Sequence, residues 1–309
     1  MTSIENFEIY DYDAVSKEII EFLIDKLNLL NRDGVVLGLS GGLDSAVCAY
    51  IAVEALGKDK VSALFMPDRD SNPQSERDAF AISKILGIEL RKINLSPILS
   101  KIGVYNLEPL PLLAPLVPLK IKEIYTIGKY NKLKGDEEST FLRTLKSEGD
   151  PELRKSVAYY SIKHRLRMLL LYYWAEIKNY AVLGCCNKTE KLTGFFIKHG
   201  DSASDIDLIS HLYKTQVREL AKFLRVPEKI IDKAPSSDLI PGITDEFALK
   251  LSYSMLDKIL YGIEQDLKNE EIASIAHTDK ETVQYVKELV RWSEHMRMPP
   301  FSISDTSLT

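Results

Sequence analysis

The stretch GVVLGLSGGLDSAVCAYIAVEAL, residues 34–56, joins an apolar run to a segment of helical character through two glycines and several polar side chains. The run GVVLGLS predicts a short buried strand, and residues 45–56 predict a helix. Between them, Ser40, Gly41 and Gly42 allow backbone N–H groups to surround an anion at the positive end of that helix. The stretch therefore predicts a strand, a phosphate-binding turn and a helix.

The same alternation of strand and helix continues along the chain. The predicted strands are GVVLGLS, KVSALFMP, IELRKINL and YAVLGCC. The predicted helices span residues 13–30, 45–56, 75–86, 151–178 and 213–224, and the chain from 244 onward is also helical. This order predicts an α/β fold with a doubly wound parallel sheet flanked by helices.

Residues 104–150 interrupt the alternation. An apolar run with four prolines, PLPLLAPLVPL, is followed by the charged segment KYNKLKGDEESTFLRTLKSEGD. An interruption of this length predicts a lid or an interface element, or else a disordered surface excursion. We expect one domain over 1–309, with an insertion at 104–150 and a helical C-terminal segment at 244–309.

Composition narrows the class of protein. The chain has 309 residues, 45% of them hydrophobic and 28% charged, so it can bury a full core. Its net charge of -5 and the lack of a basic tract disfavour a nucleic-acid partner. Three cysteines give no disulfide framework, and neither a signal peptide nor a membrane span is predicted. We expect a cytoplasmic protein with no membrane partner.

The turn SGGLDS (40–45) differs from two common phosphate-binding loops. It lacks the Gly-Lys-Ser/Thr ending of the P-loop and the third glycine of the dinucleotide fingerprint. Ser40 and Ser45 offer hydroxyls and Asp44 offers a carboxylate, a set that suits Mg²⁺ bridging to pyrophosphate oxygens. The alternative from these residues alone is a glycine-rich turn in which Ser45 caps a helix.

Several blocks of the sequence carry a resemblance to a known family. SGGLDS after a buried strand resembles the signature of ATP pyrophosphatases, the PP-loop superfamily, which implies an adenine nucleotide alpha hydrolase-like fold. VLGCCNKTEKLTGFFIKHGDSASDI, KAPSSDLIPGITDE and LSYSMLDKILYG are similar to NAD synthetases over nearly the whole chain outside 104–150. The resemblance implies ATP- and Mg²⁺-dependent amidation of deamido-NAD to NAD, through an adenylated intermediate, in a homodimer.

The resemblance also implies a set of site residues. Asp44 and Glu190 match magnesium ligands and, with Lys214, form the expected catalytic set. The residues matched to ATP binding are Gly38, Leu39, Ser40, Gly41, Gly42, Leu43, Asp44, Ser45, Arg69, Cys185, Lys214 and Ser236. Those matched to deamido-NAD are Arg165, Lys198, Asp205 and His295. In purely structural roles, Glu190 would be an exposed helix-start residue, Lys214 a solvated helix end and Arg165 a partner in a surface salt bridge.

Two positions depart from the family pattern. Cys185 stands where the family has an ATP-contacting threonine, and Met296 stands where it has a basic residue. The short amino-terminal region implies the ammonia-dependent form, unless a separate glutaminase subunit supplies nitrogen. The alternative functions are another adenylating amidotransferase or thiolase of the same loop class, and a nucleotide-binding regulator that has lost turnover.

Overall fold

A computed structural model of the chain describes residues 7–9, 11–107, 117, 119–132, 139–148, 150–236 and 242–302. The strands found there form one parallel sheet in the order β3-β2-β1-β4-β5. Their bounds are β1 (Gly34–Gly38), β2 (Val61–Phe65), β3 (Glu89–Lys92), β4 (Tyr180–Gly184) and β5 (Ile206–Asp207). The strand order reverses at β1 and β4, so the prediction of a doubly wound sheet is confirmed.

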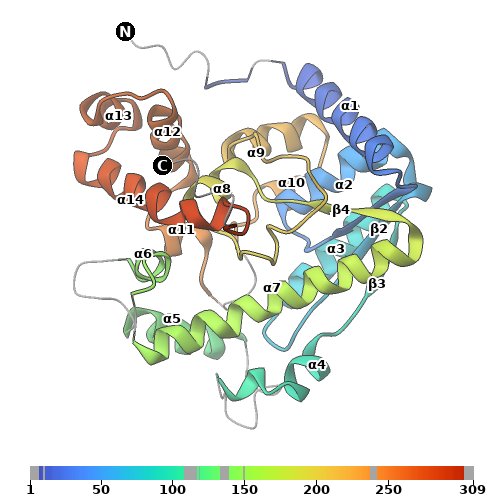
Figure 1. Cartoon of the computed structure of the whole chain (residues 1–309), viewed down its shortest axis with the longest axis horizontal. Helices are drawn as coiled ribbons and strands as arrows, with labels where there is room; N and C mark the ends of the chain where they lie inside the picture. The colour runs from blue at the N-terminus through green and yellow to red at the C-terminus, as the bar shows by residue number, and fades with distance from the viewer. Residues whose placement is uncertain are drawn as a thin grey trace.

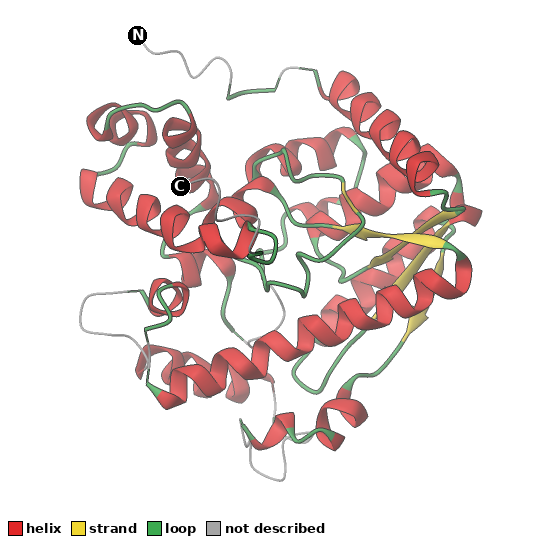
Figure 2. Cartoon of the chain, viewed as in Figure 1, coloured by secondary structure: helices red, strands yellow, loops and turns green. Residues whose placement is uncertain are grey.

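Helices cover both faces of this sheet (Figures 1 and 2). In the first half of the chain they are α1 (Tyr12–Leu30), α2 (Leu43–Leu56), α3 (Pro73–Leu86), α4 (Ser96–Lys101), α5 (Leu119–Lys132) and α6 (Thr140–Leu145). Those that follow are α7 (Pro151–Lys178), α8 (Lys188–Thr193), α9 (Lys214–Phe223), α10 (Glu228–Ile231), α11 (Asp245–Leu249), α12 (Tyr253–Glu264), α13 (Asn269–Ala276) and α14 (Lys280–Arg297).

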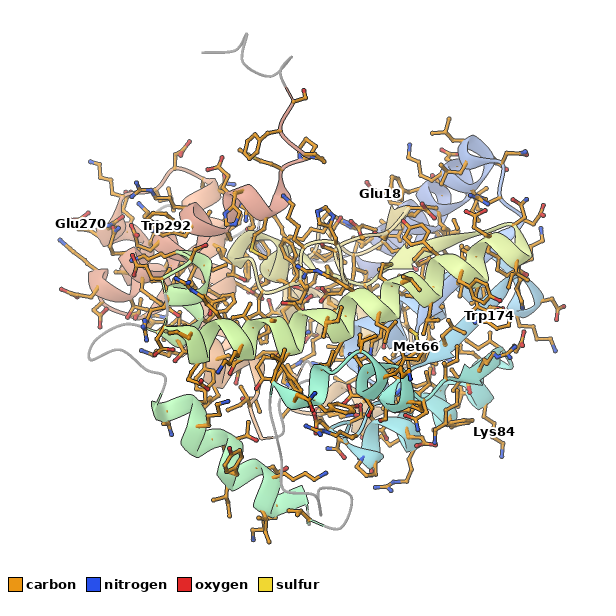
Figure 3. The ribbon with its side chains drawn as sticks, turned by 60° about the horizontal axis from the view of Figure 1, so that its bottom comes forward. Glu18, Met66, Lys84, Trp174, Glu270 and Trp292 are labelled. Carbon is orange, nitrogen blue, oxygen red and sulfur yellow. The ribbon has the colours of Figure 1, made fainter. Side chains whose placement is uncertain are left out.

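The strands divide their side chains between two cores because successive residues of a strand point to opposite faces. Val35 and Leu37 of β1 pack in the core that holds α1, α2 and α9, whereas Val36 packs in the core that holds α7. Figure 3 shows Met66, just after β2, against α7, and Arg167 of that helix donates Nε to the Met66 carbonyl at 3.0 Å. The apolar runs of the sequence thus become strands buried on both faces.

A third core lies in the C-terminal part of the chain. Helices α12, α13 and α14 gather to one side of the sheet (Figure 1) and bury residues such as Leu256, Ile272 and Leu289. Leu142 and Leu145 of α6 join this core. The helical layer therefore packs beside the carboxyl ends of the strands, next to α8 and α9, which follow β4 and β5 in the chain.

The predicted helices and strands are found close to their expected positions, whereas the short helices α4 and α10 were not predicted. α2 begins at Leu43 and not at residue 45, which puts Asp44 in its first turn. β5, with two residues, was not predicted. The segment 104–150 contains α5 and α6, whereas most of its apolar run falls outside the described residues. Within the described residues, no helix combines the length and the apolar character that a membrane span needs.

Candidate active site

The turn after β1 has the geometry that the two glycines predicted. Gly41 has φ +77°, and a Cβ there would lie 2.4 Å from the Ser75 carbonyl oxygen, so only glycine fits. The Ser40 hydroxyl accepts a hydrogen bond from the Gly42 N–H at 3.2 Å and lies 3.0 Å from the Ser45 hydroxyl. These hydrogen bonds link residues 40, 42 and 45 and so hold the turn in one conformation.

α2 starts at this turn with no side chain capping it. Gly42 is the N-cap residue, and Ser45 directs its hydroxyl back to the Gly42 carbonyl at 3.1 Å. The predicted alternative, in which Ser45 caps the helix, is therefore wrong in detail: Ser45 braces the turn from inside the first turn of the helix. The positive end of a 14-residue helix faces the turn, which favours an anion there.

Asp44, Glu190 and Lys214 converge beside this turn from three separate helices. Lys214 Nζ bonds Asp44 Oδ2 and lies 3.4 Å from Glu190 Oε1. Asp44 is in the first turn of α2, Glu190 in the first turn of α8 and Lys214 at the start of α9. Because α2 follows β1 and α8 follows β4, the three side chains meet where the strand order reverses, the usual ligand site of such sheets.

The charge of this cluster is negative overall. Asp245 also acts on Lys214, and Tyr253, whose ring centre lies 5.3 Å from Lys214 Nζ, donates its hydroxyl to Asp245 at 3.1 Å. Burial raises the pKa of Glu190 to about 8, although the charge of Lys214 acts in the other direction. Burial would lower the pKa of Lys214, but Asp44 and Glu190 outweigh it and raise that pKa. The buried carboxylates thus exceed the single cation.

Asn187 fixes two of these carboxylates and was not predicted. Its side chain accepts from the Glu190 N–H at 3.0 Å, and Glu190 Oε2 accepts from the Asn187 N–H at 3.2 Å, which makes a capping box for α8. Asn187 Nδ2 also donates to Asp44 Oδ1 at 3.2 Å. The signal was present in the sequence NKTE (187–190), which has the spacing of a capping box.

Lys233 supports the glycine turn from a distant part of the chain. Its Nζ donates to the Gly41 carbonyl at 3.2 Å, to Ser75 Oγ at 3.3 Å and to Asp78 Oδ2 at 3.2 Å. The bond to Gly41 orients the peptide that precedes Gly42. No local pattern marked Lys233 as part of the site, because its contacts come from residues about 150 or more positions away.

Three of the residues matched to deamido-NAD lie together. Arg165 Nε donates to the Lys198 carbonyl at 3.2 Å, and Lys198 Nζ donates to the His295 carbonyl at 2.9 Å. Asp205 lies apart from this chain of bonds, at the edge of the sheet, where it accepts from the Val182 N–H at 2.8 Å and from the Tyr172 hydroxyl at 3.2 Å. The expectation of a shared role for all four stays a prediction.

Arg69 and Ser236 have other contacts in this structure. The guanidinium of Arg69 lies 3.8 Å from the centre of the Tyr105 ring and donates to the Tyr159 hydroxyl at 3.1 Å. Ser236 donates to the Ile243 carbonyl at 3.2 Å. Their roles as ATP contacts stay predictions.

The two departures from the family pattern have structural consequences. Cys185 follows β4 and contacts the Cys48 thiol, and this contact together with burial raises the pKa of Cys48, which leaves that thiol inert. Met296 packs against the C-terminal core. Arg297, next to it, donates to the carbonyls of Lys191 and Leu192 at 2.9 and 3.0 Å.

A cavity of about 180 Å³ adjoins the cluster. Asp245 and residues of α5, α6 and α7 line it, together with the aromatic pair Phe195 and Phe196. His164 also lines it and carries a buried Nε2 that has no hydrogen-bond partner among the described residues, while its Nδ1 lies 3.4 Å from Asp201. The cavity has apolar walls and a few polar groups, which is the composition of a small-molecule site.

Comparison with known proteins identifies the family. The sequence profile of NAD synthase matches residues 15–107 and 134–300. The chain belongs to the NAD synthase family. The segment that the family profile leaves out, 108–133, includes the whole of α5.

Members of the family with high similarity come from several organisms. The chain is 47% identical to an NH3-dependent NAD synthetase of Thermotoga neapolitana, over 92% of this chain and 94% of the relative. It is 48% identical to the same enzyme of Thermotoga maritima, over 92% of this chain and 96% of the relative. The prediction of family membership from the sequence blocks is therefore confirmed.

Solved structures share the fold over nearly their full length. An NMN synthetase from Francisella tularensis superposes with a TM-score of 0.70 and 26% identity, over 95% of this chain and 99% of that one. An NH3-dependent NAD synthetase from Campylobacter jejuni, solved with a nitrate ion, gives a TM-score of 0.67 and 25% identity, over 95% and 100%. The fold class is thus the one found in NAD synthetases.

Proposed function

We propose that the chain amidates the nicotinate carboxylate of deamido-NAD to give NAD, at the expense of ATP and with ammonia as the nitrogen donor. The observation that carries the proposal is the convergence of Asp44, Glu190 and Lys214 beside a glycine turn at the positive end of a helix. The relatives from Thermotoga, both named NH3-dependent NAD synthetases, support the same activity.

The chemistry needs two substitutions. A carboxylate resists ammonia because it is negatively charged and lacks a good leaving group. In the first step its oxygen attacks the α-phosphorus of ATP, and the bond to pyrophosphate breaks. In the second, ammonia attacks the carbonyl carbon of the acyl adenylate, AMP leaves with the bonding electron pair, and the nitrogen loses a proton to solvent or a base. The protein contributes orientation and charge stabilisation to both steps.

The turn and Lys214 suit the first step. Backbone N–H groups at the start of α2 would hold phosphate oxygens, and Gly41 keeps that approach free of side-chain atoms. The ammonium of Lys214 lies next to Asp44 and would neutralise charge on the departing pyrophosphate. Lys233 would hold the turn in shape through the Gly41 carbonyl.

The donor set fits Mg²⁺. Asp44 and Glu190 supply carboxylate oxygens, and with Asp245 they exceed the charge of Lys214. An added cation would therefore offset the burial and the repulsion from Asp44 and Asp245 that together raise the pKa of Glu190. Within the described part of the chain no group of three or more His, Cys, Asp or Glu is arranged as a metal centre. Mg²⁺ commonly takes one or two carboxylates together with substrate phosphates and waters, and when bound it supplies charge stabilisation to those phosphates.

The groups that would hold the acid substrate come from α7, from the segment after α8 and from the end of α14. Arg165, Lys198 and the segment that ends α14 offer cations for the phosphates of a dinucleotide, and guanidinium and ammonium groups suit that task. The adjoining cavity, with Phe195 and Phe196 on its wall, has the size and apolar surface for a pyridine ring. Its wall includes Asp245, so the ring would lie close to the ATP-binding cluster.

We further propose a homodimer. On α7, Leu169, Tyr173 and Ile177 follow one another at intervals of four residues and are 62%, 57% and 56% exposed. Side chains with this spacing form one stripe along a helix, and an apolar stripe on a surface favours a protein contact. The mass in solution, measured by light scattering at several concentrations, tests this, and a monomer at all of them would contradict it.

One observation favours a second candidate substrate. The NMN synthetase from Francisella tularensis has the higher TM-score of the two structures compared above. A chain with that activity would amidate the mononucleotide acid by the same two steps. The two candidates share the ATP site and differ in the length of the acid substrate.

The test is a comparison of substrates under one set of conditions. The purified chain is incubated with ATP, Mg²⁺ and ammonium together with either deamido-NAD or nicotinate mononucleotide, and amide product and pyrophosphate are measured. We expect kcat/KM for deamido-NAD to exceed that for the mononucleotide by about tenfold or more, because the cations around Lys198 would bind the additional phosphate. The reverse order would favour the second candidate, and no amide from either acid would exclude both.

A further inference from the structure

Asp257 lies fully buried on α12, at the junction of the C-terminal helices with the site. Its Oδ1 accepts from the Thr189 hydroxyl at 2.6 Å, and its Oδ2 accepts from the Thr215 N–H and the Thr215 hydroxyl at 2.8 Å each. Both threonines come from outside α12. One carboxylate therefore bonds two separate helices.

The bonds form a closed network at the first turns of these helices. Thr189 lies in α8 immediately before Glu190, and Thr215 lies in α9 immediately after Lys214. The Thr189 hydroxyl also accepts from the Lys214 N–H at 3.0 Å. Asp257 is thus linked to the backbone of Lys214 by two routes. One runs through Thr215, the next residue in the chain, and the other runs through the Thr189 hydroxyl.

Such a carboxylate is expensive to bury. Burial raises the pKa of Asp257 to about 6, against the effect of its hydrogen bonds to Thr189 and Thr215, and Lys214 lowers it less. A well-packed apolar residue in such a position commonly gives equal or greater stability. A carboxylate at this position has a structural reason, because three donors bind to one group and fix the first turns of α8 and α9 relative to each other.

We propose that Asp257 is a positioning residue that sets the separation of Glu190 and Lys214, and so the placement of metal and phosphates relative to the acid substrate. The inference rests on the proposed function. Asp257 itself bonds Thr189 and Thr215 and acts on the reacting groups only through the two helix ends. Displacements of about 1 Å at such groups can reduce turnover by about a hundredfold.

The chain offers a matched set of variants. T189V removes the hydroxyl that links Asp257 to Lys214, while T189S retains it. D257N keeps the volume but exchanges one acceptor oxygen for a donor. T193V is the control, because Thr193 is equally buried on α8 but bonds only the carbonyls of Thr189 and Glu190 within its own helix.

Steady-state kinetics give the first readout. We expect kcat to fall by about tenfold or more in T189V and D257N, with KM for deamido-NAD within about twofold of the parent, and T189S to restore most of the loss. T193V should lose stability to heat and keep its kcat. Equal kcat per folded molecule in T189V and T193V would overturn the proposal. If T189V does not fold, the pair T215V and T215S makes the same comparison on α9, where the backbone bond to Asp257 remains.

Binding gives a second readout that needs no turnover. Calorimetric titration with ATP, with and without Mg²⁺, measures how much the ion increases affinity. We expect this increase to shrink by about tenfold in D257N and T189V and to persist in T193V. If the parent protein makes no NAD, the proposed function fails while this titration still tests Asp257. If the parent makes NAD and both readouts of D257N match it, the positioning role fails alone.

Discussion

Lys163 and Lys214 are both buried, and each lies between two carboxylates. Lys163 of α7 bonds Asp68 at 3.1 Å and Asp70 at 2.8 Å. Lys214 of α9 bonds Asp44 and lies 3.4 Å from Glu190. By composition alone the two clusters look alike, yet they differ in charge and in access to solvent.

The Lys163 cluster is closed, and its carboxylates are fully compensated by cations. Arg167 bonds Asp68 at 3.2 Å, the Tyr159 hydroxyl bonds Asp70, and the side chains of Lys163 and Asp68 have no exposed surface. Arg69 lies beside Asp70 as well. Cations here outnumber carboxylates, and each of the two carboxylates has several partners.

The Lys214 cluster is open and unbalanced. The side chains of Asp44 and Glu190 keep 17% and 15% of their surface exposed, and Asp245 adds negative charge. The comparison teaches that a buried ion pair by itself does not mark a site. Uncompensated charge that is accessible to solvent is the better mark of a site, because a ligand can still pair with it.

The largest expected effect tests the open cluster. Asp44→Asn should lower kcat/KM for NAD formation by about ten-thousandfold, or about 5 kcal/mol, because under the proposed function Mg²⁺ and Lys214 would lose a charged partner at the phosphates. The free energy of unfolding should change little, since Lys214 retains Glu190. Full activity in the variant would contradict the proposed role of Asp44 as a metal ligand and the contrast drawn between the two clusters.

The closed cluster should respond in the opposite way. Lys163→Met leaves Asp68 and Asp70 buried without their central cation and should lower the free energy of unfolding by about 3–5 kcal/mol in a denaturant titration. Lys178→Met is the control, because Lys178 pairs with Glu89 at 2.7 Å near the surface and such pairs contribute about 1 kcal/mol or less. Equal losses of unfolding free energy in the two variants would show that the buried cluster stabilises the fold no more than the surface pair does.

The pH dependence of stability should have opposite signs in the two clusters. The raised pKa of Glu190, about 8, means that the folded chain holds a proton which the unfolded chain releases. Glu190 therefore destabilises the fold progressively as pH rises from its ordinary value of 4.5 towards 8. Burial would raise the pKa of Asp70, but Lys163 and Tyr159 lower it overall, so the stability it gives is complete above its ordinary value and is lost in acid.

Two variants measure these signs in the absence of Mg²⁺ and nucleotide. Glu190→Gln should gain stability over the parent at about pH 8, on the order of 2 kcal/mol, and gain little at about pH 4. Asp70→Asn should be less stable than the parent at neutral pH, with a gap that narrows in strong acid. A constant gap across the pH range for either variant would contradict the assigned titration.

The smallest expected effect concerns the turn itself. Lys233→Met should raise KM for ATP by about tenfold, because the Gly41 peptide loses the donor that orients it. Lys229→Met is matched to it, since Lys229 lies 3.6 Å from the same Asp78 but has more than half of its surface exposed. An equal rise in the KM for ATP in both variants would show that the effect comes from the loss of positive charge near Asp78 and not from the bond to the Gly41 carbonyl.

The sequence predicted the framework well because its signals are local. Alternating buried strands and helices required only the apolar pattern, and Gly41 required only its position after a strand. β5 was missed because two residues, Ile206–Asp207, give no periodicity to detect. α5 was missed because charged and apolar residues in the interruption suggested a loop.

The site was predictable only in part. The convergence of Asp44, Glu190 and Lys214 came from resemblance, since no local pattern places three helix starts together. Lys233 and Asp257 gave no signal, because a charged residue in an amphipathic segment usually faces solvent. Their partners are set by tertiary packing between segments far apart in the chain.

The run of charges on α7 restricts how this gene can vary in length. Lys163 and Arg167 point into the closed cluster, and Arg165 between them donates to the Lys198 carbonyl, among the residues proposed to hold the acid substrate. One inserted residue would rotate everything beyond it by about 100° and exchange these faces. Substitutions can be tolerated along this helix, but insertions and deletions within it should be absent from any functional variant.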